Sequence, residues 1–123
     1  MGGAQGRAVT VTIYHNPRCS KSRATLALIE ARGIKPKIVD YLKTPPSAAA
    51  LKAILRKLGL TPRDILRAGE TIYAERGLKT RDLDDDALIA LMVKNPIVIE
   101  RPIVVAGTRA AVGRPPENVL AIL

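Results

Sequence analysis

The fold of this chain is decided by residues 9–42, which read VTVTIYHNPRCSKSRATLALIEARGIKPKIVDYL. Val9 to Tyr14 are β-branched or aromatic without a break, which is typical of a strand buried on both faces of a sheet. Apolar residues at helical spacing predict a helix over residues 19–32, and Gly33 is placed to end it. Lys37 to Leu42 form a second strand candidate. This order predicts a right-handed βαβ crossover unit with the first strand at the centre of the sheet.

After Leu42 the sequence predicts three helices, then short strands, and then a last helix. Three helices are predicted, each from a capping residue at its start and a stop signal at its end. They run from Ser47 to Gly59, from Thr61 to near Gly69, and from Asp84 to Asn95-Pro96. β-branched runs then predict strands, and a final helix follows a proline pair. These elements are the strands Ile97–Ile99, Ile103–Val105 and Ala110–Val112, the last two forming a hairpin across Gly107-Thr108, and the helix that begins at Pro115-Pro116-Glu117.

This order of elements predicts an α/β fold with a mixed β-sheet flanked by helices. A helical insertion separates the βαβ unit from the C-terminal β-hairpin, which is the thioredoxin-like plan. Residues 9–123 are expected to form this single domain. Residues 1–8, MGGAQGRA, lack any apolar period and are expected to be a flexible tail.

Charge is distributed unevenly along the 123 residues, which carry a formal net charge of +9. Residues 1–67 hold 13 Lys and Arg against 3 Asp and Glu, whereas residues 68–123 hold 7 against 8. This imbalance predicts either an anionic partner for the first part or a solvated basic face. Nucleic acid is not the expected partner, because the basic residues never form a run and only three tyrosines are available for stacking.

Cys19 is the only cysteine, so no disulfide can form within one chain, which suits a reducing compartment. The longest apolar run is too short to span a membrane, and the composition of the first residues leads us to expect no leader sequence. We therefore expect a cytoplasmic monomer that has no membrane partner.

Cys19 is also the strongest nucleophile in its segment. It lies where the first predicted helix begins, and the unpaired N–H groups and macrodipole of a helix start stabilise a thiolate. Arg18, Lys21 and Arg23 add positive charge nearby, and such settings lower a thiol pKa from about 8.5 toward 3.5–7.5. The sequence favours a reactive thiolate over the alternative of a buried, inert cysteine.

Two polar residues flank this cysteine. His15 is the only histidine, so His and Cys cannot assemble a metal cluster and no metal is expected. The imidazole either tunes Cys19 electrostatically or hydrogen-bonds the loop. Ser22 shares a helix face with Cys19 and either donates a hydrogen bond to the thiolate or an oxyanion, or merely lies on the helix surface.

Three arginines occupy positions that break local rules. Arg63 places a cation at the positive end of a helix, and Arg101 and Arg114 each directly precede a proline. Guanidinium groups bind tetrahedral oxyanions bidentately, so three that converge can hold a small multiply charged anion. The alternative for each arginine is an ordinary surface position.

Five segments carry a resemblance to a known family. They are Tyr14–Arg23 (YHNPRCSKSR), Tyr41–Pro46 (YLKTPP), Thr61–Arg67 (TPRDILR), Glu100–Val105 (ERPIVV) and Gly113–Glu117 (GRPPE). Together they resemble the glutaredoxin-dependent arsenate reductases of the thioredoxin superfamily, over nearly everything after the tail. The resemblance implies that Cys19 is the nucleophile and that Arg63, Arg101 and Arg114 bind the oxyanion. It also implies a cis peptide bond before Pro102.

The resemblance further implies what this enzyme does. Arsenate is reduced to arsenite through a covalent cysteine–arsenic intermediate, with glutathione as co-substrate, glutaredoxin as partner and no bound cofactor. His15 and Ser22 are then supporting groups. Two alternatives remain: a glutathione-dependent thiol oxidoreductase of another substrate, and a thioredoxin-like transcriptional adaptor without catalysis. Such adaptors carry a CxxC pair, and Ser22 stands where the second cysteine would be.

Overall fold

The computed structural model describes residues 10–67 and 83–123, and its centre is a four-stranded mixed sheet with the order β3-β2-β4-β5. The strands are β2 (Val11–His15), β3 (Lys37–Asp40), β4 (Ile103–Ala106) and β5 (Arg109–Val112). β2 pairs in parallel with β3 and antiparallel with β4, and β4 pairs antiparallel with β5. The predicted βαβ unit, the interior position of its first strand and the predicted hairpin are confirmed.

Helices surround this sheet, and local signals explain their ends. They are α1 (Ser20–Ala31), α2 (Ala48–Leu58) and α4 (Asp85–Lys94), with the 3₁₀-helices η1 (Pro62–Ile65), η3 (Pro96–Val98) and η4 (Pro116–Ile122). The side chains of Ser47 and Asp84 accept the capping hydrogen bonds of α2 and α4, from the N–H groups of Ala50 and Ala87 at 3.1 and 2.8 Å. Within the described ranges no helix is both long and apolar enough to cross a membrane.

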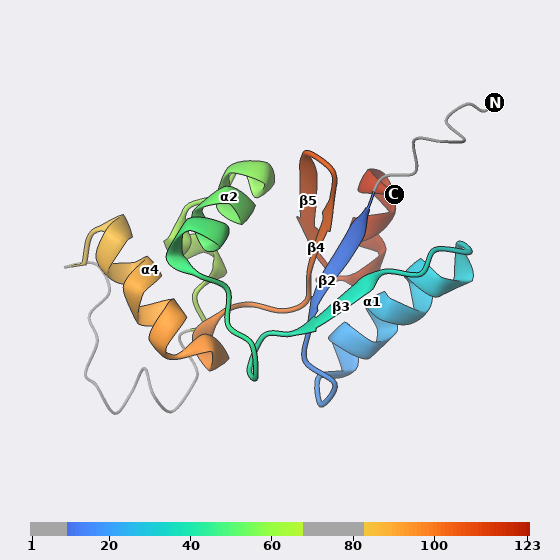
Figure 1. The fold of residues 1–123 in the computed structure, drawn as a ribbon. Coiled ribbons are helices and arrows are strands. Elements are labelled where there is room, and N and C mark those ends of the chain that lie inside the picture. The colour runs from blue at the N-terminus through green and yellow to red at the C-terminus, as the bar shows by residue number, and fades with distance from the viewer. Residues whose placement is uncertain (1–9, 68–82) are drawn as a thin grey trace.

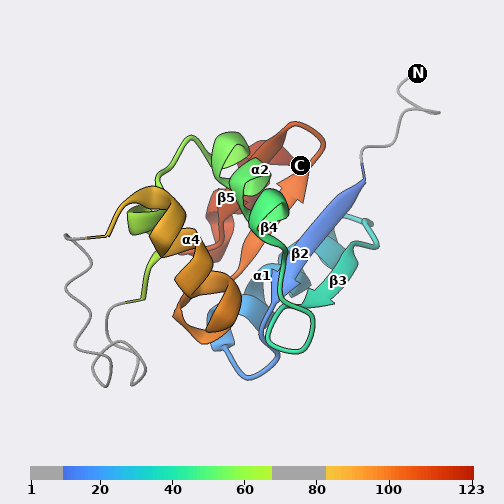
Figure 2. The same ribbon diagram turned by 60° about the vertical axis from the view of Figure 1, so that its left-hand side comes forward.

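The helices pack in a layer on each face of the sheet (Figures 1 and 2). α1 and η4 cover one face, where Ile13, Ile29, Val104 and Val119 form a buried cluster. α2 and α4 cover the other face with a larger cluster. Its buried members are Tyr41, Leu51, Ile54, Leu55, Ile65, Ile89, Met92, Val98, Ile99 and Ile103.

Strand register brings three separate segments together at one end of the sheet. Tyr14 of β2 pairs with Ile103 of β4, and Ile103 also pairs with Val112 of β5. The loop that follows β2, the residues before β4 and the residues after β5 therefore meet. The Gly113 N–H donates to the Pro102 carbonyl at 2.9 Å and ties the last two segments together.

Two predicted elements are wrong in extent or type. The run Ile97–Ile99 is not a strand, because Pro96–Val98 forms the 3₁₀-helix η3 and only Ile99 pairs, in an isolated bridge with Leu66. The same bridge ends η1 at Ile65, well before the predicted stop near Gly69, which lies outside the described residues. Local hydrogen bonds to the carbonyls of Asn95 and Pro96 override the strand preference of the first segment, and long-range pairing of Leu66 ends the helix of the second.

The remaining predicted elements differ from the structure only in their type of helix or in their bounds. The predicted last helix is the 3₁₀-helix η4, and the first strand begins at Val11. The predicted tail, residues 1–8, and the strand residue Val9 lie outside the described residues. The peptide bond before Pro102 is cis, as the resemblance implied, and so is the bond before Pro115.

Gly113 is packed too closely for any side chain. A Cβ there would lie 2.5 Å from Thr25 Oγ1 of α1 and 2.8 Å from Pro102 Cγ. We expect Gly113→Ala to lower the free energy of unfolding by about 1–3 kcal/mol, because neither neighbour can move without disturbing the core. Urea denaturation followed by circular dichroism measures this change.

A double-mutant cycle separates this overpacking from a general effect of the substitution. Thr25→Ala removes both threonine atoms that crowd the new methyl group, so the cost of Gly113→Ala should be smaller in the Thr25→Ala background. If the two costs simply add, the contact with Thr25 does not limit residue 113.

Candidate active site

Cys19 occupies the N-cap of α1 with its sulfur partly exposed. Its backbone is extended (φ −93°, ψ 123°), and its N–H donates to the Asn16 carbonyl at 2.9 Å. Asn16 is itself buried, and its side-chain oxygen accepts from the Arg18 N–H at 3.0 Å. These two bonds close the turn after β2 and present the thiol at the open end of the helix.

The surroundings of Cys19 stabilise its thiolate. Burial by itself would raise the pKa of the thiol. The backbone N–H groups of Ser22 and Lys21, in the first turn of α1, act in the opposite direction. The Arg101 side chain and the Arg114 charge act with them, and the net result is a thiol pKa below its ordinary value. This environment belongs to a reactive cysteine rather than an inert one.

Arg114 is a cation that contacts the sulfur. Its Nη2 lies 3.5 Å from Cys19 Sγ, although the two residues are 95 positions apart in the chain. Its Nε donates to the Arg101 carbonyl at 2.7 Å. Arg101 in turn is held by a hydrogen bond from its Nη1 to the Ile97 carbonyl at 3.2 Å. Both arginines are partly buried, and the structure places both beside Cys19.

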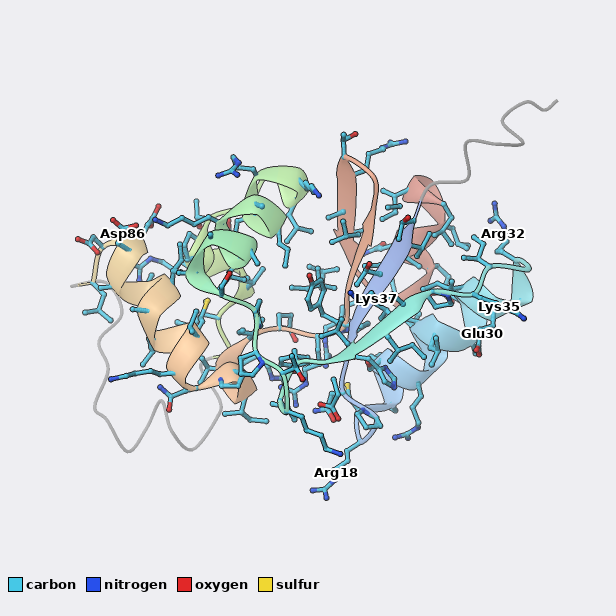
Figure 3. All side chains as sticks on the ribbon, viewed as in Figure 1. Arg18, Glu30, Arg32, Lys35, Lys37 and Asp86 are labelled. Carbon is cyan, nitrogen blue, oxygen red and sulfur yellow. The ribbon has the colours of Figure 1, made fainter. Side chains whose placement is uncertain are left out.

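The cations next to Cys19 in sequence act less directly than the sequence suggested. Arg18 points away from the molecule at the turn before α1 (Figure 3). Arg23 turns back along the loop, where its Nη1 donates to the Pro17 carbonyl at 2.9 Å. Lys21 acts on the thiol through its backbone N–H. The guanidinium groups that stabilise the thiolate come from the far end of the chain instead.

His15 and Ser22 form a buried polar pair beneath the thiol loop. His15 Nδ1 lies 2.6 Å from Ser22 Oγ, which also accepts the Asn16 N–H at 3.0 Å. The hydroxyl keeps its hydrogen and a second lone pair, so it either donates to Nδ1 of a neutral imidazole or accepts from a protonated Nδ1. Burial, aided by the charge of Arg23, lowers the pKa of His15 against the opposing charge of Asp40. The structure therefore favours the loop-bonding role for His15, and Ser22 lies in the interior rather than on the helix surface.

We expect Ser22→Ala to destabilise the protein by about 1–3 kcal/mol, since it leaves the buried Asn16 N–H and the imidazole without their partner. Urea unfolding is the measurement. Ser20→Ala is the matched control, because Ser20 is exposed on the same turn of α1. Equal stabilities for the two variants would show that the buried pair does not hold the loop.

Arg63 lies apart from the contacts described so far. It is exposed in η1, and its Nη2 donates to the Leu83 carbonyl at 3.1 Å, just before α4. The contacts described for this residue do not reach Cys19. Its predicted role in binding an oxyanion remains a prediction.

Three residues near the site were not singled out from the sequence. Glu100 bonds to both Arg67 and Arg114, with its Oε1 2.6 and 2.9 Å from their nitrogens. Tyr41 is buried beside the cluster, and burial raises the pKa of its hydroxyl to about 12 against the charges of Arg101 and Arg67. Glu100, Arg67 and Tyr41 all lie within the five segments of the resemblance, but nothing in their spacing indicated a shared location.

Comparison with known proteins identifies close relatives. Residues 14–122 match the model of the ArsC family. The chain is 51% identical over 114 residues to an arsenate reductase of Neisseria meningitidis serogroup A, which covers 92% of this chain and 97% of that protein. It is 51% identical over 114 residues to the uncharacterized protein YfgD of Escherichia coli K12, with coverage of 92% and 96%.

A solved structure shows the same likeness in three dimensions. An arsenate reductase from Vibrio cholerae superposes with a TM-score of 0.90 at 52% identity, over 94% of this chain and 99% of that chain. The predicted thioredoxin-like α/β fold is thereby confirmed.

Proposed function

Because the chain belongs to the ArsC family, we propose that it reduces arsenate to arsenite through a covalent bond between arsenic and the Cys19 sulfur. Glutathione and glutaredoxin serve as the reductants in this proposal. The observation that carries it is the placement of Cys19 Sγ at the start of α1, 3.5 Å from Arg114 Nη2. The relatives named arsenate reductase support the choice of oxyanion.

In the first step, the Cys19 thiolate attacks arsenic(V). An arsenate oxygen takes up protons and leaves as water, and a sulfur–arsenic bond forms. Arg101 and Arg114 neutralise the charge of the remaining arsenate oxygens, which would otherwise repel the anionic nucleophile. The backbone N–H groups at the start of α1 hold the thiolate until the anion arrives.

The second step needs two electrons, which two thiols supply. Glutathione provides the second thiol, because Cys19 has no cysteine partner in this chain. When glutathione sulfur bonds to Cys19 sulfur, the electron pair of the sulfur–arsenic bond stays on arsenic, which departs as arsenite. A glutaredoxin thiolate then attacks the glutathione sulfur of the mixed disulfide and releases Cys19 as thiolate.

A coupled assay tests this function. With glutathione, glutaredoxin, glutathione reductase and NADPH present, the protein should cause NADPH oxidation that depends on arsenate. Omission of glutaredoxin should slow turnover, and arsenite should appear in proportion to the NADPH consumed.

Other outcomes would identify a different activity. NADPH oxidation with a glutathione mixed disulfide but not with arsenate would indicate a thiol oxidoreductase of another substrate. Inactivity in both assays would overturn the proposed enzyme.

A further inference from the structure

The carboxylate of Glu100 joins the charged groups that surround Cys19. Its Oε1 accepts hydrogen bonds from Arg67 Nη1 at 2.6 Å and from the Arg101 N–H at 3.2 Å. The same oxygen lies 2.9 Å from Arg114 Nε. One oxygen thus accepts two hydrogen bonds and forms an ion pair with Arg114, and the three partners come from the segment after η1, the residue before Pro102 and the loop after β5.

These contacts determine where the Arg114 guanidinium points. Nε is held by Glu100 Oε1 and by the Arg101 carbonyl, both within 2.9 Å. A guanidinium is planar, so fixing Nε on one side directs the opposite nitrogens to the other side. There Nη2 lies 3.5 Å from Cys19 Sγ. Without Glu100, Arg114 would keep the hydrogen bond from Nε to the Arg101 carbonyl but lose the ion pair that holds the same side of its guanidinium.

The negative charge of Glu100 by itself would disfavour both a thiolate at Cys19 and a bound anion. A carboxylate close to Cys19 and the two arginines repels a thiolate and an anionic substrate, so removing its charge should favour both. Because this charge weakens anion binding, the position of the carboxylate beside Cys19 must have another explanation. The contacts supply one, since two hydrogen bonds and the ion pair with Arg114 all meet at a single oxygen.

We propose that Glu100 is a positioning residue that aims Arg114 at the Cys19 sulfur and at the anion bound there. The proposal rests on the proposed function only for its kinetic test. The ionisation of Cys19 tests it whatever the substrate is.

Two substitutions separate placement from charge. Glu100→Gln keeps the length and an acceptor oxygen where Oε1 lies but removes the charge. Glu100→Asp keeps the charge but withdraws the oxygen from Arg114 by one methylene. If Glu100 acts by placement, the Gln variant should resemble the wild type and the Asp variant should be impaired.

The first readout is the pKa of the Cys19 thiol, measured from the ultraviolet absorbance of the thiolate as a function of pH. We expect it to rise in Glu100→Asp and not to rise in Glu100→Gln, where loss of the carboxylate charge can only lower it. The second readout is arsenate kcat/KM, which should fall about tenfold or more in Glu100→Asp, the size of one charge-assisted hydrogen bond. Glu30→Gln and Glu30→Asp are the matched controls, because Glu30 is exposed near the C-terminal end of α1 (Figure 3).

Any other pattern overturns the proposal. A thiol pKa that falls in Glu100→Gln while Glu100→Asp stays normal would show that the carboxylate acts by charge. Two normal variants would show that Arg114 is oriented without it, and two equally impaired variants would show that placement alone does not explain its role. If the thiol pKa shifts as expected but neither wild type nor variants reduce arsenate, the proposed function fails and the positioning role stands.

Discussion

The Cys19→Ser variant is expected to fold as the wild type does and to lose arsenate reduction by roughly a thousandfold or more, since a hydroxyl is a far weaker nucleophile than a thiolate. Its stability should be preserved or increased. Cys19 holds the N-cap position of α1 with the extended backbone that a capping residue adopts. Serine is among the best N-cap residues, worth about 0.5–2 kcal/mol relative to alanine. The coupled NADPH assay and urea unfolding measure the two effects.

Ser20→Ala serves as the control for a small change on the same turn, and it should keep wild-type activity. Two results would count against the nucleophile assignment. The first is a Cys19→Ser variant that still reduces arsenate at a comparable rate. The second is one whose inactivity is accompanied by loss of the folded state.

Loss of either guanidinium beside Cys19 is expected to have the next largest effect. Arg101→Ala and Arg114→Ala should each lower arsenate kcat/KM by about one to two decades, because each removes a charge-assisted bond worth roughly 1.5–3 kcal/mol. Both groups lower the pKa of the Cys19 thiol, so their loss should raise it. The acidic limb of the kcat/KM profile should therefore move to higher pH in both variants. Arg114→Lys should remain impaired, since lysine has no Nε to bond Glu100 and the Arg101 carbonyl.

Arg63 and Arg109 complete this series. Arg63→Ala should weaken arsenate turnover, as the predicted oxyanion site requires, but leave the thiol pKa unchanged, because the described contact of Arg63 is to Leu83. Arg109→Ala is the control, since this arginine is exposed at the end of β5 away from Arg114. If Arg101→Ala and Arg114→Ala behave like Arg109→Ala, the oxyanion binds elsewhere and the cluster around Cys19 is not its site.

The sequence by itself determined the features that depend on neighbouring residues. Ser47 and Asp84 cap helices because their side chains reach an N–H three residues later, and this reach does not depend on the rest of the fold. Gly33 and Gly59 adopt positive φ where α1 and α2 end, as the local pattern predicted. The position of Cys19 at a helix start is a local property of the same kind.

Only the tertiary structure decided which groups surround Cys19. Arg114 reaches the sulfur across 95 residues because the pairing of β2, β4 and β5 brings the ends of these strands together. At the predicted strand Ile97–Ile99, local hydrogen bonds after Asn95-Pro96 form a 3₁₀-helix, and only Ile99 pairs across the chain, with Leu66. The backbone hydrogen bonds around the bridge between Leu66 and Ile99 place Glu100 beside Arg67, and Arg114 reaches it from the loop after β5; spacing along the chain predicts neither contact. Spacing reveals partners within one helix turn or one hairpin, whereas partners across the sheet depend on a register that is set only when the whole core packs.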